Sequence, residues 1–290
     1  MIVITGANGK LGRAITTRLL DQVPADLVGI SVREPAQSVE LAERGVRVRR
    51  GDFADAASLA VAFEGGSQVL IVSAGATGDT AVRLNRTAIQ AAKEAGVERI
   101  LYTSHMAAST NSLFAPMPTH AASEQALQES GVSFTALRNG FYTSTVLRLL
   151  GDAAQTGELA LPEDGSVSWT AHADLADAAV AALTGTELDG VTPSLTAAEA
   201  LDMSDVAAIV SELVGRQVRR RTVSDEEYRT QLIAQGVPGP AADFSLGMFR
   251  ASRRGEFAEI DPTLTQVLGR PSTSVRDVLR DALTPVVAVD

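Results

Sequence analysis

The chain begins with MIVITGANGKLGRAITTRLL (residues 1–20), in which an apolar strand runs into a glycine loop and then into a helix. Gly6, Gly9 and Gly12 let the backbone approach a phosphate closely, and the free N–H groups of the helix amino end receive its charge. The GxxGxxG spacing is weak evidence by itself, because a tight turn that binds nothing uses the same residues. At the start of a repeated α/β pattern it favours a dinucleotide site. The expected contacts are Gly6, Asn8, Gly9, Lys10, Leu11 and Gly12.

Short apolar runs alternate with helical patterns through the first half of the chain. The runs are continuous rather than alternating, which implies burial on both faces, as in a parallel sheet covered by crossover helices. We therefore expect an α/β fold, a doubly wound parallel Rossmann sheet with a second, smaller α/β lobe. The expected strands are 2–5, 27–32, 46–50, 68–72, 99–103 and 133–137, and the expected helices are 13–20, 56–63, 80–95 and 122–130.

The regular alternation of apolar runs and helical patterns ends after Asn139. We predict a nucleotide-binding domain over residues 1–140, with returning segments near 167–198, and a smaller substrate lobe over 141–290 that is interleaved with it. Residues 236–257 (GVPGPAADFSLGMFRASRRGEF) combine Gly and Pro with scattered apolar residues, a pattern typical of a mobile cover. Further helices are expected at 143–154, 173–183, 204–214 and 225–235.

Composition narrows the functional classes. The formal net charge of −10 opposes attraction to nucleic acid or to an anionic membrane, since both are polyanions. Cysteine is absent, which excludes disulfides and thiolate chemistry, and with only three histidines we expect no metal site. No segment has the apolar length needed to cross a bilayer. Because no leader pattern precedes the first strand, we expect a cytoplasmic protein.

The end of the second expected strand indicates which dinucleotide binds. In LVGISVREP (residues 27–35) a cation, Arg33, stands where it would accommodate a 2′-phosphate, which favours NADP(H). Two observations leave alternatives open: the adjacent Glu34 could turn inward, and a lone arginine can be merely solvated. Asp52 and Phe53 follow the third strand, where Asp52 either contacts the adenine amino group or caps a helix.

The usual catalytic pair of short-chain reductases, Tyr-x-x-x-Lys, is missing. In that pair lysine lowers the pKa of a tyrosine that protonates a carbonyl oxygen as hydride arrives. Here the residue four positions after Tyr102 is Met106. Lys93 lies on a helical pattern where a solvated surface charge is the simpler interpretation.

Several segments carry a family resemblance. ITGANGKLG, SVREPAQ, AAKEAGVERILYTSH, HAASEQALQESGVSFTALRNGFY, HADLADAAVAAL and GRQVRRRTVSDEEYRTQLIAQGVP together resemble the NmrA-like group of atypical short-chain dehydrogenases, and within it the NADPH-dependent quinone oxidoreductases. The resemblance covers nearly the whole chain. It implies NADP(H) in the first lobe and a flat acceptor between the lobes. Some NmrA-like relatives have lost turnover and sense the redox state of the cofactor while contacting another protein, which is the alternative function.

One position departs from the relatives. His120 stands where several of them have a lysine, so it either replaces that lysine near the nicotinamide or merely begins the following helix. Reduction of a quinone does not require the dyad, because hydride addition gives a hydroquinone anion whose charge spreads into the ring. We therefore expect an NADPH-dependent reductase that passes hydride directly to a quinone or a similar flat acceptor, without flavin or metal.

The carboxyl ends of the parallel strands place the remaining candidates. Several have a structural alternative: the small residues form only a turn, His105 satisfies a loop carbonyl, and the aromatic residues belong to the core. Trp169 and His172 are interpreted as core packing and a local cap, and Arg219 to Arg221 as a solvated strand. The sequence leaves the physiological acceptor and a possible homodimer open. The cofactor candidates are Ser73, Ala74, Gly75, Ser104 and His105; the acceptor candidates are Ala76, His105, Asn139, Phe141 and Tyr142; the catalytic candidates are His120, Asn139 and Tyr142.

Overall fold

The structure is a computed structural model that describes residues 1–283. The chain divides into two compact units. The first contains Met1–Asn111, Pro116–Asn139 and His172–Leu195, and the second contains Ser112–Ala115, Gly140–Ala171 and the residues from Thr196 onward.

The first unit is built on a seven-stranded sheet in which every pairing is parallel. All five residues of β2 and the first six of β5 are buried, as expected for strands covered on both faces. The strand order is β10-β6-β5-β4-β1-β2-β3, so the direction of winding changes between β1 and β4. A doubly wound sheet binds its ligands at such a switch point, beyond the carboxyl ends of the strands. The strands are β1 (Ile2–Thr5), β2 (Val28–Val32), β3 (Arg47–Arg50), β4 (Gln68–Ile71), β5 (Arg99–His105), β6 (Ser133–Asn139) and β10 (Ser194–Leu195).

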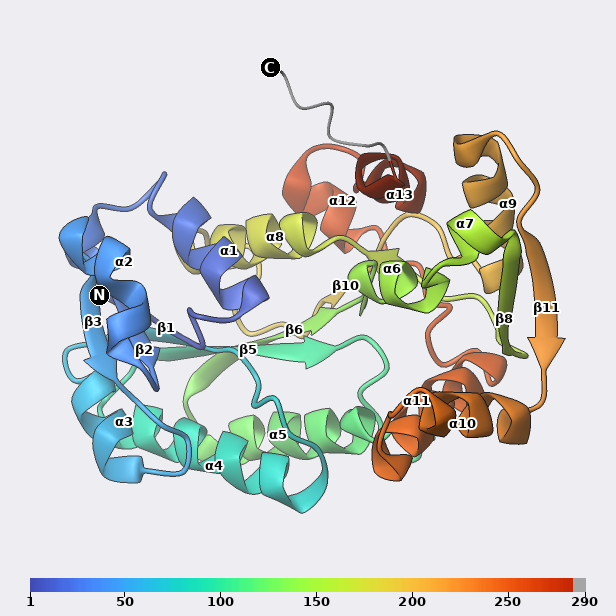
Figure 1. The fold of residues 1–290 in the computed structure, drawn as a ribbon. Helices are drawn as coiled ribbons and strands as arrows, with labels where there is room; N and C mark the ends of the chain where they lie inside the picture. The colour runs from blue at the N-terminus through green and yellow to red at the C-terminus, as the bar shows by residue number, and fades with distance from the viewer. Residues whose placement is uncertain (284–290) are drawn as a thin grey trace. The chain divides into compact units, whose positions relative to one another are not determined.

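Helices cover both faces of this sheet, which confirms the expected doubly wound architecture. Figure 1 shows α1 (Lys10–Leu19) and α8 (His172–Thr184) on one face, and α3 (Ala56–Phe63), α4 (Gly78–Glu94) and α5 (Pro116–Ser130) on the other. Shorter elements follow β1 and β2: η1 (Ala25–Leu27), η2 (Pro35–Ser38) and α2 (Val39–Glu43). The core beneath α3, α4 and α5 includes Leu59, Phe63, Ile71, Ile100, Tyr102 and Leu127.

The second unit has two short parallel strand pairs and a larger share of helix. β7 (Phe141–Tyr142) pairs with β9 (Trp169–Thr170), and β8 (Glu158–Pro162) pairs with β11 (Arg219–Val223). Its helices are α6 (Ser144–Leu150), α7 (Ala153–Thr156), α9 (Met203–Val214), α10 (Asp225–Ala234), α11 (Gly239–Arg253), α12 (Thr263–Leu268) and α13 (Val275–Leu283). Among residues 1–283, no helix combines the length and apolar character that crossing a membrane requires.

Three features of this unit differ in part from the expectations. The predicted mobile cover is largely the helix α11, whose Leu246 and Phe249 are buried; Pro240 lies in its first turn, where a missing N–H costs nothing. The single helix expected over 143–154 is divided into α6 and α7, because Gly151 has a φ of 47° and a non-helical ψ. In the expected solvated strand Arg219 and Arg221 are exposed as predicted, whereas Arg220 is partly buried and pairs with Asp164 at 3.1 Å.

Candidate active site

The glycine loop leaves the amino end of α1 open. Gly6 has a φ of +63°, and its carbonyl accepts the N–H of Gly9 at 2.9 Å, which closes the turn. A Cβ at Gly12 would lie 2.4 Å from the oxygen of Gly6, so only glycine fits there. Gly9 is the N-cap, no side chain caps the helix, and its first turn holds no acidic residue. The first-turn N–H groups therefore have no intrahelical acceptor and fit a pyrophosphate.

Asn8 links this loop to the segment after β2. Its amide nitrogen Nδ2 donates to the carbonyl oxygen of Glu34 at 3.2 Å, and its Oδ1 accepts from the Ser38 hydroxyl at 2.7 Å. Arg33, next to Glu34, is exposed, whereas the hydroxyl of Ser31 is buried without a hydrogen-bond partner. The exposed Arg33 thus offers a cation at the end of β2, which fits a phosphorylated ribose, whereas the buried Ser31 hydroxyl is not accessible.

Asp52 does not cap α3. The N-cap is Asp55, whose Oδ1 accepts the N–H of Ser58 at 3.1 Å. Asp52 instead accepts the N–H of Ala54 at 2.9 Å and so closes a local turn. Contacts of Asp52 and Phe53 with the adenine ring stay a prediction.

Side chains of neighbouring elements hold the loop after β4 in place. The N–H of Ser73 donates to the Thr103 hydroxyl at 2.9 Å, and the N–H of Ala74 donates to Asn85 Oδ1 at 3.0 Å. A Cβ added at Gly75 would meet nothing within 4 Å. The loop is therefore fixed by its backbone while open space remains beside it, which suits the predicted nicotinamide ribose contact of Ala74 and Gly75.

His120 lies in the second turn of α5, which begins at Pro116. The alternative that His120 merely begins this helix is therefore wrong. Its Nδ1 lies 3.1 Å from the Tyr102 hydroxyl, which also receives a hydrogen bond from the Asn85 amide at 3.1 Å. The rings of His105 and His120 approach to 6.2 Å between centroids, so the structure brings these two predicted residues together.

Burial keeps both histidines uncharged. It lowers the pKa of His105 to about 3, with the neighbouring His120 adding to the shift, and lowers the pKa of His120 to about 4 against an opposing effect of Glu124. His105 Nδ1 accepts the N–H of Ala107 at 3.2 Å, so this ring nitrogen serves a loop N–H. Neutral histidines of this kind donate and accept hydrogen bonds but do not act as acids at pH 7.

The predicted ribose contact Ser104 is already engaged with a carboxylate. Its hydroxyl donates to Glu124 Oε1 at 2.6 Å. Arg138 Nε and Nη2 donate to the two oxygens of Glu124 at 2.9 and 2.6 Å, a bidentate pair. Glu124 thus connects β5, α5 and β6 under the site, and a ribose would meet Ser104 as an acceptor.

The residues expected to wall the acceptor belong to different units. Asn139 ends β6 in the first unit, where its Oδ1 is buried without a partner. Phe141 belongs to the second unit, and its ring lies 5.7 Å from Phe114, 5.4 Å from Trp169 and 5.0 Å from Phe257, between centroids. This cluster confirms core packing for Trp169. The acceptor contacts of Ala76, Asn139, Phe141 and Tyr142 stay predictions.

Sequence reasoning missed Asn85, Ser123 and Glu124. A signal for Asn85 was present: it falls in line with Ala81, Ala88 and Ala92 on the buried face of α4. A polar residue within an apolar stripe requires internal partners, because burial of an unpaired amide is costly.

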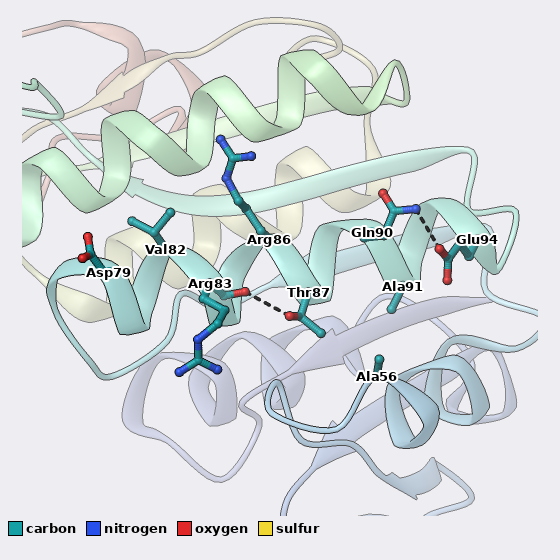
Figure 2. Close-up of a pocket in the computed structure, with 9 residues that line it drawn as sticks. All are labelled: Ala56, Asp79, Val82, Arg83, Arg86, Thr87, Gln90, Ala91 and Glu94. Carbon is teal, nitrogen blue, oxygen red and sulfur yellow. Dashed lines mark hydrogen bonds between the residues drawn. The ribbon is translucent and has the colours of Figure 1, made fainter.

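The opposite face of α4 carries a shallow groove of about 520 Å³. Figure 2 shows Asp79, Arg83, Arg86 and Glu94 along it, with Ala56 of α3 opposite. Polar side chains of the groove form hydrogen bonds within α4; for example, Gln90 Nε2 donates to Glu94 Oε1 at 2.7 Å. None of the predicted site residues lines this groove.

The fold and the glycine loop define a dinucleotide-binding Rossmann protein. Similarity to known proteins supports this class. Residues 6–186 match the NAD(P)H-binding family model. The chain is 32% identical to quinone oxidoreductase 2 of Escherichia coli K12 over 96% of both chains, and 27% identical to an NmrA-like family oxidoreductase of Aspergillus flavus over 97% of this chain and 94% of that one.

Two solved structures have the same fold along the whole chain. An E. coli NADPH-dependent quinone oxidoreductase with NADPH superposes with a TM-score of 0.93 and 30% identity, and Citrobacter triphenylmethane reductase with NADP(H) superposes with a TM-score of 0.91 and 30% identity. Each alignment covers 98% of this chain and 100% of the other. The protein belongs to the NmrA-like NAD(P)H-binding family, and NADP(H) is its cofactor.

Proposed function

We propose that the protein is an NADPH-dependent reductase that transfers hydride directly to a quinone or a similarly flat acceptor. The observation that carries the proposal is the open amino end of α1, with its uncapped N–H groups and the strictly required Gly12, in a chain that aligns end to end with an NADPH-dependent quinone oxidoreductase. These features supply the dinucleotide site, and the relatives indicate the class of acceptor.

NADPH supplies the hydride when it is bound. Lys10, Leu11 and Gly12 hold the pyrophosphate through their backbone N–H groups, and Arg33 pairs with the 2′-phosphate. Ala74 and Gly75 make room for the nicotinamide ribose, on a loop that Thr103 and Asn85 keep fixed. The main contribution of the chain is then to hold two flat rings at reacting distance.

This reaction does not require the missing dyad. Hydride addition to a quinone gives an anion that the aromatic ring delocalises, so water can deliver the proton afterwards. A triphenylmethane dye is a still simpler case, because hydride adds to a cationic carbon and no proton is needed. Met106 in the position of the dyad's lysine is compatible with both acceptors.

The test is turnover of NADPH by purified protein with a panel of small quinones. We expect acceptor-dependent loss of NADPH absorbance, and we expect the Gly12→Ala variant to lose it. NADPH binding without turnover of any quinone would contradict this function and support the alternative, a redox sensor that acts through a protein partner.

Three further assignments belong to this proposal. Asn139 and Tyr142 are predicted to contact the acceptor, with Phe141 as an apolar wall. A cytoplasmic location and a homodimer stay predictions, which fractionation and light scattering test.

A further inference from the structure

A buried amide, Asn85, organises the polar groups beside His120. Asn85 has 1% of its surface exposed, and its Oδ1 accepts the N–H of Ala74 at 3.0 Å. Its Nδ2 donates to the Tyr102 hydroxyl at 3.1 Å and to the Ser123 hydroxyl at 3.0 Å. A backbone N–H can only donate, so the oxygen of the amide must face Ala74. The nitrogen must then face Tyr102.

This orientation makes the Tyr102 hydroxyl an acceptor toward Asn85, which bears on its hydrogen bond with His120. The Tyr102 hydroxyl has one hydrogen, it already accepts from Asn85, and His120 Nδ1 lies 3.1 Å away. Tyr102 is fully buried. A hydroxyl that accepts from Asn85 keeps its own hydrogen for donation, and donation to Nδ1 makes this nitrogen an acceptor. A neutral imidazole that accepts at Nδ1 carries its hydrogen on Nε2.

We propose that Tyr102 and Asn85 are positioning residues that hold His120 as the Nε2–H tautomer, so that its ring presents a fixed hydrogen-bond donor to an oxygen of the bound acceptor. The burial that lowers the pKa of His120 keeps the ring uncharged at pH 7. The ionisable groups that face His120 are His105, Glu124 and Tyr102. The tautomer is inferred from these hydrogen bonds without reference to any ligand, whereas the use of the donor rests on the proposed function.

A fixed donor distinguishes between two kinds of acceptor. Reduction of a quinone moves an electron pair onto a carbonyl oxygen, and a donor at that oxygen stabilises the developing charge. His120 keeps its own proton, and the proton that completes the hydroquinone comes from water. When hydride adds to the central carbon of a cationic triphenylmethane dye, no oxygen gains charge. The donor has nothing to stabilise in that reaction.

The tautomer is measured by ¹⁵N NMR of the histidine rings at pH 7 in the absence of nucleotide. We expect a pyridine-type Nδ1 signal and a pyrrole-type Nε2 signal for His120. Tyr102→Phe, which keeps the ring and removes the hydroxyl, should convert this single tautomer into a mixture. Ser123→Ala, which leaves the bond from Tyr102 to His120 in place, should preserve it. A charged ring or an Nδ1–H tautomer in the native protein would overturn the proposal.

Kinetics with two acceptors test the use of the donor. We expect Tyr102→Phe to lower kcat for a small quinone about tenfold, the effect of one weakened hydrogen bond, with little change in KM for NADPH. Its kcat for malachite green, a cationic triphenylmethane dye, should match that of the native protein. An equal loss with both acceptors would refute the donor role. The expected NMR spectrum without turnover of either acceptor would contradict the proposed function while upholding the tautomer.

Discussion

The glycine loop and the polar groups around His120 (the His120 network: Asn85, Tyr102, Ser123 and Glu124) lie in the same unit. They differ in whether their hydrogen-bond donors already have partners. In the loop, the first-turn N–H groups of α1 have neither a side-chain cap nor an acidic neighbour. In the network, the amide of Asn85 has three hydrogen-bond partners and the whole side chain is buried. Hydrogen-bond donors without a partner can bind a polyanion, whereas donors that already have partners fix the direction of a neighbouring hydrogen bond. The loop should therefore determine affinity for the cofactor, and the network should determine geometry.

The largest effect should come from closing the loop. Gly12→Ala places a methyl group 2.4 Å from the backbone oxygen of Gly6, so the turn must shift and lose bonds to the pyrophosphate. Two charge-assisted hydrogen bonds are worth about 3 kcal/mol or more, which corresponds to a Kd for NADPH raised about 100-fold or more. Calorimetric titration measures it. Gly239→Ala is the control, since its nearest atom is at the end of the Arg229 side chain, and it should leave the Kd unchanged.

Loss of the cation after β2 should have the next largest effect and should depend on the nucleotide. Arg33→Ala removes the proposed partner of the 2′-phosphate, so the Kd for NADPH should rise about 10- to 100-fold while the Kd for NADH stays the same. Titration with both nucleotides compares them. Equal weakening of the two would show that Arg33 does not bind the phosphate.

On the network side, removal of one charge should reduce stability. Glu124→Gln removes the carboxylate that holds Arg138 in a bidentate pair, and we expect the free energy of unfolding to fall by about 2 kcal/mol, allowing for the partial exposure of Arg138. Urea denaturation measures the change. Asp243→Asn breaks an exposed ion pair with Arg229 and should give no measurable loss. A similar loss of stability in both variants would show that the pair of Glu124 with Arg138 stabilises the fold no more than an exposed ion pair does.

An effect of a different kind should be a dependence of stability on pH. Burial lowers the pKa of His105 from 6.5 to about 3, so below pH 6.5 the unfolded chain binds a proton that the folded chain does not. Stability therefore falls as the pH drops from 6.5 towards 3. This histidine contributes a slope that approaches about 1.4 kcal/mol per pH unit. Denaturation between pH 7 and 4.5 should show a shallower slope for His105→Asn, and identical slopes would mean that His105 is not desolvated.

The same contrast explains which parts of the structure the sequence predicts. The glycine loop and the buried strands are local: burial of all of β2 is visible in its own five apolar and small residues. The doubly wound fold follows from their repetition, and it is confirmed. The helix α11 was missed because Gly239 and Pro240 normally interrupt helices, yet here they form its first turn.

The network could not be predicted in the same way, because its members come from separate elements. Asn85, Tyr102 and His120 lie on α4, β5 and α5, and they meet only when β4 and β5 pair in register. Periodicity places each residue on a buried face but does not say which polar atoms become partners. The sequence therefore identified His120 as a candidate without the Tyr102 and Asn85 that orient it.

If the open amino end of α1 binds a phosphorylated nicotinamide nucleotide, calorimetric titration of the native protein will detect the binding. We expect binding of one NADPH per chain, weaker binding of NADH, and loss of both heats in Gly12→Ala. Folded protein that releases no heat with either NADPH or NADP⁺ would contradict this expectation.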